Sequence, residues 1–495
     1  MTKKYLLSKA VAAAMMFAGL MLTSCDENDN AIINGEVYVK PEVQLVDGGA
    51  VVTANTIADI NRMIGRLNEA IKEAADAGET FTVNIEAPAL DATATENTIS
   101  ILTPNGADIV VNFTNPISTD EPLVIESKGV SDDTPSAAST NEVEINFAAG
   151  TSNIDLNLFM PASTVTLKGG TFNELTTTTA NNTLILESGI TIDWLNVKGG
   201  HVLVQDGATI NGIILETGYV TNKGAYKPDA AGQPSVYYID ENKEEQAYYA
   251  KKVKLAKILN ANGDVAVSHL AIANQIDEAE DVEVIISDGA KAFLQFYMPF
   301  SGVPTIASVI GEGDATIVST QCTYIKKLKN VTLEPWSQSQ LALPQNCENC
   351  IFKSYGFKFQ YDTYKLFSEN TTVTFKNCEF VHTLDSDLPQ IINTQLPYMD
   401  TETGFTSFEI RFDNCTFKKL TQFNINKKMY DDEAYQYTLT FNGTKIGDQV
   451  ITGNTELISD MNYFDEAHPQ PLFNIDGKTY QPQNTAGVWS LVEAE

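Results

Sequence analysis

Residues 143–215 contain four copies of one short motif: 144–150 read EINFAAG, 166–170 TLKGG, 184–189 LILESG and 203–207 LVQDG. Each copy alternates apolar and polar residues, as a strand with one buried face does, and each ends on a glycine. The closing glycines stand 20, 19 and 18 residues apart, and a second short apolar strand follows most of them. A repeat of this length without helical segments predicts a solenoid whose coils are β throughout.

A second repeat reads Asn-Cys-any-Phe at 349–352, 377–380 and 414–417. Degenerate copies at 330–333 and 442–446 extend it, so the asparagines stand 19, 28, 37 and 28 residues apart. Asparagine tolerates the left-handed backbone of a tight corner and can bond to its counterpart one coil away. We therefore expect each Asn at a corner between strands, with the Cys and Phe side chains stacked inside the coils.

The two repeats together resemble the right-handed parallel β-helix superfamily, the pectin-lyase-like fold shared by polysaccharide lyases, glycosidases and surface adhesins. The shorter glycine-closed coils are similar to those of secreted adhesin and autotransporter passenger domains. The resemblance is architectural and identifies no single family. It implies an all-β chain that forms a right-handed parallel β-helix solenoid.

Two stretches with helical spacing interrupt the strands. The first predicts an amphipathic helix between an Asn55 N-cap and a stop at Gly78, with one apolar face made of Ile57, Ile60, Ile64, Leu67, Ile71 and Ala74. Because this helix precedes the solenoid, we expect it to cover the open end of the first coil. Residues 244–259 predict a second helical insertion, with Tyr249, Val253, Ala256 and Leu259 on one side.

The predicted domain organisation follows from these elements. The C-terminal part contains the Asp476-Gly477 hairpin signal, so we expect residues 473–480 and 488–491 to pair as a cap. The expected segments are a lipoprotein signal peptide (1–24), a tether (25–50), a capping helix with a first β-helix segment (51–222), a linker with a helical insertion (223–281), a second β-helix segment (282–446) and a C-terminal cap (447–495).

The N-terminus has the features of a bacterial lipoprotein signal. A basic start precedes an apolar core at 11–20, and residues 22–25 (LTSC) resemble a lipobox, in which the residue matching Cys25 is lipidated. An ordinary signal peptide with an incidental cysteine is the alternative. No later stretch approaches the ~20 apolar residues of a membrane span, so the lipid would be the only membrane anchor.

The expected location is the outer membrane with exposure at the cell surface, and a periplasm-facing lipoprotein is the alternative. Residues 26–30 (DENDN) resemble an acidic surface-export signal of some Gram-negative lipoproteins, although a solvated tether explains them equally well.

The charge of the chain limits its partners. The formal net charge is −32, and loss of residues 1–24, with three lysines and no acids, would make it −35. So acidic a protein repels phosphate backbones, which argues against nucleic-acid binding, and it disfavours acidic polysaccharides.

Five cysteines follow Cys25, and Cys350, Cys378 and Cys415 occupy the same repeat position. We interpret these as small buried side chains in a ladder, while disulfides remain open. A zinc site at Cys347 and Cys350 lacks a second pair or a histidine at ligand spacing, so no metal is expected.

The catalytic motifs of the superfamily are incomplete in this sequence. Polygalacturonase-like enzymes use Asn-Thr-Asp, Asp-Asp, Gly-His-Gly and Arg-Ile-Lys motifs, whose carboxylates cleave glycosides. Here residues 200–202 read GHV, and the acidic pairs at 132–133 and 431–432 lie in predicted loops. Pectate-lyase-like enzymes need a basic residue, for which Arg411 is the candidate. Alternation places it outward between Glu409 and Asp413, as expected of a surface ion pair, and His382 near Asp385 and Asp387 is the remaining acid–base cluster.

Aromatic residues offer a binding surface instead. Positions 355, 357, 359 and 361 alternate strictly, so all four side chains share one strand face. An internal face would make them core, whereas an external face would make them a stacking platform for sugars. The candidate stacking residues are Trp336, Tyr355, Tyr361 and Tyr364, and no catalytic, cofactor or metal residue is assigned.

The sequence thus favours a lipid-anchored cell-envelope β-helix protein that binds a glycan or a surface protein without catalysis. One alternative is a diverged polysaccharide lyase or glycoside hydrolase, and a second is a passive structural spacer in an envelope assembly. Contact with the membrane is expected only through the lipid anchor, and no cofactor or nucleic-acid partner is expected.

Overall fold

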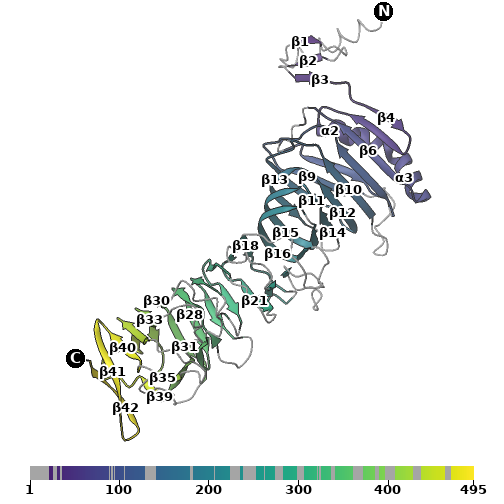
Figure 1. Ribbon diagram of the computed structural model, residues 1–495. Helices are drawn as coiled ribbons and strands as arrows, with labels where there is room; N and C mark the ends of the chain where they lie inside the picture. The colour runs from purple at the N-terminus through teal and green to yellow at the C-terminus, as the bar shows by residue number, and fades with distance from the viewer. Residues whose placement is uncertain are drawn as a thin grey trace, which may run out of the picture. The chain divides into compact units, whose positions relative to one another are not determined.

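The computed structural model shown in Figure 1 describes most of the chain from residue 39 to residue 494. The described ranges are 22–25, 31–33, 36–38, 39–128, 141–222, 235–237, 252–273, 282–297, 306–335, 341–360, 372–395, 407–426, 436–462 and 470–494, without positions 89, 91, 92, 94, 105, 179–181, 206, 261, 320, 321, 323, 324 and 385–388. The chain forms two compact units, residues 1–213 with 217–225 and residues 214–216 with 226–495.

Short antiparallel strands precede the first coil. They are β1 (Leu22–Cys25), β2 (Ala31–Ile33) and β3 (Glu36–Tyr38), followed by a hairpin of β4 (Glu42–Val46) and β5 (Gly49–Thr53). The segment expected to be a tether, 25–50, therefore contains strands in its described part.

Parallel pairing between successive coils builds the first unit. Most paired strands are two apart in the chain, which gives two parallel sheets. The first contains β5, β6 (Thr80–Glu86), β8 (Asp108–Phe113), β10 (Asn141–Phe147), β12 (Ser163–Lys168), β14 (Thr183–Leu186) and the end of β15 (Thr191–Val204). The second contains β7 (Thr98–Leu102), β9 (Leu123–Lys128), β11 (Ile154–Phe159), β13 (Thr171–Thr177), the start of β15, and β16 (Thr209–Asn222).

The glycine-closed repeats pair in the register that their sequences predict. Ile145 lies opposite Leu167, Leu167 opposite Leu186, and Leu186 opposite Val204, and all four side chains are buried. The closing glycines have φ between 84° and 94°, a backbone that residues with a Cβ rarely adopt. The parallel solenoid prediction is confirmed for this unit.

The predicted capping helix exists as α2 (Ile57–Ile64), a 3₁₀ turn (Gly65–Leu67) and α3 (Asn68–Ala77). Its buried face is the predicted one with Met63 added, although Ala74 is partly exposed, and it packs on β5, β6 and β7. Gly78 ends it with φ 68°, as expected. The N-cap is Thr56, whose hydroxyl accepts from the Asp59 amide at 3.1 Å. The Asn55 prediction was wrong by one residue, because the Asn55 side chain accepts from the Val39 amide instead.

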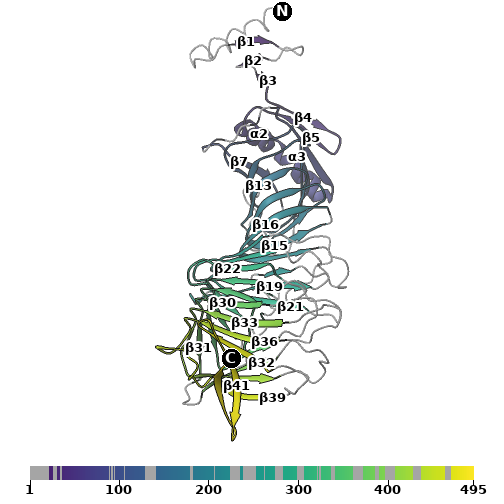
Figure 2. The ribbon, with the colours of Figure 1, turned by 60° about the vertical axis from the view of Figure 1, so that its left-hand side comes forward.

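Three parallel sheets build the second unit, whose strands lie side by side in Figure 2. The first sheet contains β18 (Lys252–Leu255), β20 (Glu283–Ile286), β22 (Ser308–Gly311), β24 (Lys327–Lys329), β27 (Asn346–Glu348), β30 (Thr372–Lys376), β33 (Ser407–Asp413), β36 (Gln436–Asn442) and β40 (Leu472–Ile475).

Its second sheet contains β17 (Ser235–Tyr237), β19 (Val267–Ala273), β21 (Lys291–Tyr297), β23 (Thr316–Val318), β25 (Thr332–Glu334), β28 (Ile351–Ser354), β31 (Glu379–His382), β34 (Thr416–Phe417) and β37 (Lys445–Ile446). The third contains β26 (Leu341–Ala342), β29 (Phe357–Gln360), β32 (Gln390–Gln395), β35 (Thr421–Asn426) and β39 (Ile458–Asn462).

The second helical insertion was wrong where the structure describes it. Residues 252–255 form β18, which pairs in parallel with β20, and the residues before 252 in the predicted helix lie outside the described part. Val253 and Leu255 are fully buried, while Lys254 points outward and lies 3.0 Å from Glu312. The segment forms a strand because its side chains are buried alternately and its backbone pairs with β20. These tertiary contacts outweigh its helical spacing. Among the described residues, 57–77 is the only helical segment.

The asparagine corners are confirmed. Asn330, Asn349, Asn377 and Asn414 all have left-handed backbone, with φ between 53° and 56°. The amide of Asn349 donates to the Asn330 Oδ1 at 3.1 Å, and the amide of Asn377 donates to the Asn349 Oδ1 at the same distance. The last copy was misaligned by one residue, because Gly443 takes the corner with φ 55° and Thr416 pairs with Lys445.

The phenylalanines of this repeat stack inside the second unit. Phe352 and Phe380 have ring centroids 5.0 Å apart, and Phe380 and Phe417 4.7 Å apart, each pair nearly parallel. A second column on the first sheet runs through Phe375, Phe412 and Phe441 at 5.4 and 5.2 Å. Each buried ring contributes about 1.5–3 kcal/mol relative to an exposed one, so these two columns form the main core of this part.

The thiols form the predicted ladder. All five described cysteines are free and buried. The thiol of Cys378 contacts Cys350 on one side and Cys415 on the other, and contact with Cys378 together with burial holds the pKa of Cys350 well above its usual value. Burial raises the pKa of Cys322 to about 12.

The C-terminal hairpin is also confirmed. β40 turns at Asp476 and Gly477, both with positive φ, into β41 (Lys478–Thr485), which pairs with β42 (Val488–Glu493). Antiparallel pairing here ends the parallel stack of the first sheet.

Replacing Asn377 separates the two roles of the corner residue. Asn377→Gly keeps the left-handed backbone accessible and loses the side-chain bond, which contributes about 1 kcal/mol. Asn377→Ala loses the bond and also places a Cβ in the left-handed region, which costs a further ~1–2 kcal/mol. We expect urea unfolding followed by circular dichroism to rank wild type, Gly and Ala in that order of stability. An Ala variant as stable as wild type would contradict the corner assignment.

The buried thiols should not react in the folded protein. We expect a thiol reagent at pH 8 to modify the five ladder and core cysteines only after denaturant is added. Because the pKa of Cys322 rises from 9.0 to about 12 on folding, its contribution to stability is complete below pH 9 and is lost as the pH rises toward 12. A Cys322→Ala variant should lack this part of the alkaline destabilisation. Rapid labelling of the native protein at Cys350, Cys378 and Cys415 would show that the ladder faces outward.

Candidate functional site

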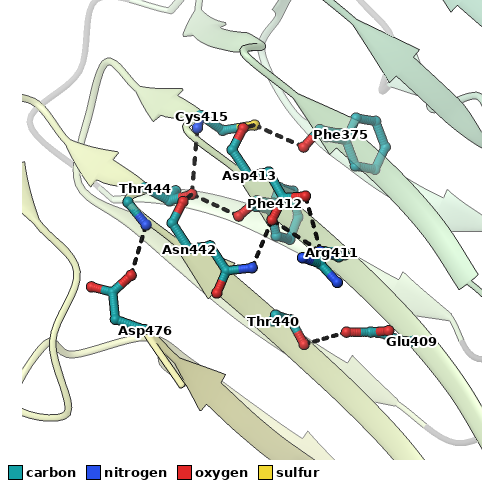
Figure 3. A network of polar contacts seen from close by, with 11 residues as sticks. Phe375, Glu409, Arg411, Phe412, Asp413, Cys415, Thr440, Asn442, Thr444 and Asp476 are labelled. Carbon is teal, nitrogen blue, oxygen red and sulfur yellow. Dashed lines mark hydrogen bonds and ion pairs between the residues drawn. The ribbon is translucent and has the colours of Figure 1, made fainter. Parts of the chain in front are cut away.

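The outer face of the first sheet in the second unit gathers the polar residues that the sequence singled out around Arg411. β30, β33 and β36 pair in parallel, with Phe375, Phe412 and Phe441 in one buried row. Strand alternation therefore turns the residues on either side of that row outward. Figure 3 shows the resulting network on β33 and β36.

Asp413 is the centre of this network. The Nε of Arg411 donates to both of its carboxylate oxygens, at 3.0 and 2.9 Å, and the Asn442 amide donates to its Oδ1 at 2.7 Å (Figure 3). These charge-assisted bonds hold the Arg411 guanidinium against the Asp413 carboxylate. The Arg411 side chain nevertheless remains 44% exposed.

A second pair stands one row along the same strands. The Thr440 hydroxyl donates to the Glu409 carboxylate at 2.5 Å (Figure 3). Thr440 itself is buried, so this bond holds the Glu409 carboxylate close to the sheet. The pair joins β33 to β36 from the outside, beside the inner stack of Phe412 and Phe441.

Charges of alternate sign continue this face across the neighbouring strands. Lys329 lies 3.1 Å from Glu348, and Lys376 lies 3.9 Å from the other oxygen of Glu348. Lys376 is in turn the register partner of Asp413. We call this row of Lys329, Glu348, Lys376 and Asp413, together with Arg411 bound to Asp413, the charged face.

The corner beside the charged face is tightly bonded. The Thr444 hydroxyl donates to the Phe412 carbonyl at 2.9 Å and accepts from the Cys415 amide at 3.4 Å (Figure 3). The Gly443 amide donates to the Asp476 carboxylate at 2.7 Å. These bonds tie three successive coils together, so the outer residues are presented by a rigid support.

The two carboxylates of β33 do not match a glycosidase pair. Glu409 and Asp413 are four residues apart on one strand, which separates them by ~13 Å at ~3.3 Å per residue. Glycoside hydrolysis needs two carboxyl groups roughly 5–9.5 Å apart. Arg411 has the outward position and the ion pair that its sequence context predicted, with Asp413 as its partner.

Of the four predicted stacking residues, only Tyr355 lies in the described part of the chain. Trp336, Tyr361 and Tyr364 lie outside the described residues. Tyr355 is half-buried at the corner between β28 and β29, while Phe357 and Phe359 are buried in the core. For the two phenylalanines, the alternation therefore reflects packing in the core.

The described part of the chain does not bring the other candidate catalytic residues together into a site. His382 has its Nδ1 3.1 Å from the carbonyl of Leu384, and the acids expected beside it at 385 and 387 lie outside the described residues. The acidic pairs at 132–133 and 431–432 also lie outside them. Cys25 ends strand β1, and its side chain is not described.

No protein-family model, no curated protein and no solved structure matches this chain. Within the described residues, no helix has the length and apolar character needed to span a membrane. Nor do those residues gather three or more His, Cys, Asp or Glu side chains in a group that could hold a metal ion.

The sequence predicted the bonds between corner asparagines but missed the bond between coils that joins Asn442 to Asp413. The link from Asn442 to Asp413 depends on a register of 29 residues, and the Asn442 corner alignment had placed that residue one position away. The position before each corner could have predicted this link. Lys376, Asp413 and Asn442 all stand directly before a left-handed residue, so they occupy the same place in successive coils.

Proposed function

We propose that this chain is a lipid-anchored cell-envelope protein that binds an extended glycan along its charged face without cleaving it. The observation that carries the proposal is the row of partly exposed groups of alternate sign, Lys329, Glu348, Lys376 and Asp413, held on successive strands of one rigid sheet. The right-handed, pectin-lyase-like β-helix and the location at the cell surface are parts of the same proposal.

The chemistry of the face suits a polar, uncharged polymer. Carboxylates accept from sugar hydroxyls, whereas ammonium and guanidinium groups donate to hydroxyl and ring oxygens. A polymer lying along the stack meets a new rung every ~4.8 Å, so each rung can add a contact. The net charge of −32 works against a polyanionic chain, which the carboxylates on this face would also repel.

Binding in place of cleavage is supported by the arrangement of the acids. The ~13 Å between Glu409 and Asp413 along one strand exceeds the span of an acid–base pair. Both carboxylates are also engaged, one by Thr440 and the other by Arg411 and Asn442.

Removing the charges should weaken glycan binding while leaving the fold intact. We expect the full chain in detergent to bind neutral polysaccharides on a glycan array, and the triple variant Glu348→Gln, Arg411→Gln, Asp413→Asn to lose at least tenfold in affinity, which is about 1.4 kcal/mol. The matched control is Lys168→Gln. Lys168 lies 2.8 Å from Glu144 on the first unit, and this bond lowers the pKa of that carboxyl, so the control removes an equivalent exposed pair elsewhere.

Several results would contradict the proposal. If the triple variant binds as tightly as the wild type, the charged face is not the binding site. Release of shorter oligosaccharides, seen by mass spectrometry, would identify a diverged lyase or hydrolase. Binding of protein but of no glycan would replace the ligand class, and binding of neither would favour a structural spacer.

The anchor has its own test. Cys25→Ala should leave the chain unprocessed or release it from membranes, because the acyl chains supply about 0.8 kcal/mol per buried CH₂ group. Membrane fractionation and the mass of the mature protein measure both effects. Cys322→Ala, at a buried thiol, is the control and should not change either one. Unchanged partitioning and mass in Cys25→Ala would refute lipidation.

A further inference from the structure

Trp194 stands on the outside of the first unit, where a tryptophan is not needed for the core. It lies on β15 opposite Glu174 of β13, between the buried residues Ile192 and Leu195. Two residues separate these inward side chains because the strand carries an extra residue there, as β13 does. The bulge therefore turns both Asp193 and Trp194 outward.

The indole is held in place by a glycine on the next strand, β16. A Cβ added at Gly212 would lie 2.6, 2.7 and 3.0 Å from the Cε3, Cζ3 and Cδ2 atoms of Trp194. Any side chain at 212 would thus push the ring away. The six-membered ring lies over the backbone of Gly212, which is buried, while Trp194 itself stays partly exposed.

Polar groups surround this ring on the same face. The Oε1 of Glu174 accepts from the Thr176 hydroxyl at 3.0 Å and from the Asn196 amide at 3.2 Å, which fixes the carboxylate. On the other side, the Asn211 amide donates to the Asp193 carboxylate at 2.8 Å. Among the described residues, neither the second oxygen of Glu174 nor the indole N–H of Trp194 has a hydrogen-bond partner.

We infer that Trp194 and Glu174 form a stacking subsite for a neutral pyranose. The apolar face of a sugar ring packs on an aromatic side chain, and the hydroxyls at its edge need acceptors and donors in the same plane. Here the indole supplies the platform, the free Glu174 oxygen an acceptor and the indole N–H a donor. The carboxylates of Glu174 and Asp193 within this patch repel an anionic sugar.

This inference rests on the proposed glycan-binding function and adds a second contact site, in the other unit of the chain. The two sites have no residue in common, so their variants can be tested independently.

Fluorescence of Trp194 tests the subsite in the full chain. The sequence has three tryptophans, so Trp336→Phe with Trp489→Phe leaves Trp194 as the only one. Titration with neutral xylo-, manno- and gluco-oligosaccharides should give a saturable change in its emission for at least one of them, and an oligogalacturonate should give none. Trp194→Ala should lower the affinity for the responding sugar at least tenfold on a glycan array.

The matched control is Phe159→Ala, which removes another outward aromatic residue of the same sheet, 49% exposed, and should leave binding unchanged. Circular dichroism and thermal unfolding confirm that both variants fold. Absence of any emission change, or full binding by Trp194→Ala, would overturn the subsite. If the charged-face variant loses binding while Trp194→Ala keeps it, only this inference fails. If the wild-type chain binds no glycan, both proposals fail.

Discussion

Parallel pairing of each strand with the strand one coil away is the interaction on which the rest of this structure depends. Every rung repeats the register of the one before, so a residue type that recurs at the repeat length becomes a column. Within the second unit, one pairing register places Phe375, Phe412 and Phe441 in a buried row and Lys376, Asp413 and Asn442 in an outer row. Core and surface are thus set by the same hydrogen bonds.

The corners make that register unambiguous. A strand that slipped by one residue would move every inward side chain to the outside. Left-handed residues at fixed positions prevent this, because few residues other than Asn and Gly adopt that backbone without strain. The amide bonds from Asn349 to Asn330 and from Asn377 to Asn349 then align successive corners. The capping helix and the C-terminal hairpin complete the arrangement by covering or ending stacks whose edges would otherwise remain open.

The sequence predicted the contacts between residues of the same repeat position and missed a contact between coils that joins different positions. The glycine-closed strands, the asparagine corners and the thiol ladder follow from residue types at a regular spacing, so one chain was enough to find them. The ion pair of Arg411 and Asp413 lies within one strand and was visible from alternation. The bond from Asn442 to Asp413 needed the length of an irregular coil, which no local pattern gives.

The same contrast explains the error at 252–255. Val253 and Leu255 fit a strand, while Val253 with Ala256 and Leu259 fit a helix, and only the pairing of β18 with β20 decides between them. Trp194 was missed for a related reason. Its outward position comes from a bulge, which interrupts the alternation that sequence reasoning relies on.

The division between core and surface gives the outer residues a particular freedom. Exposed ion pairs contribute only about 0–1 kcal/mol each, whereas the buried aromatic columns and the backbone ladder supply most of the stability. The solenoid would therefore tolerate loss of the charged face with little change in folding. The alternation of sign places opposite charges on neighbouring strands, as in the pairs of Glu348 with Lys329 and Lys376, whereas like charges directly opposite each other would be destabilising. Because these pairs contribute little to stability, variants on this face can test the proposed binding with little interference from the fold.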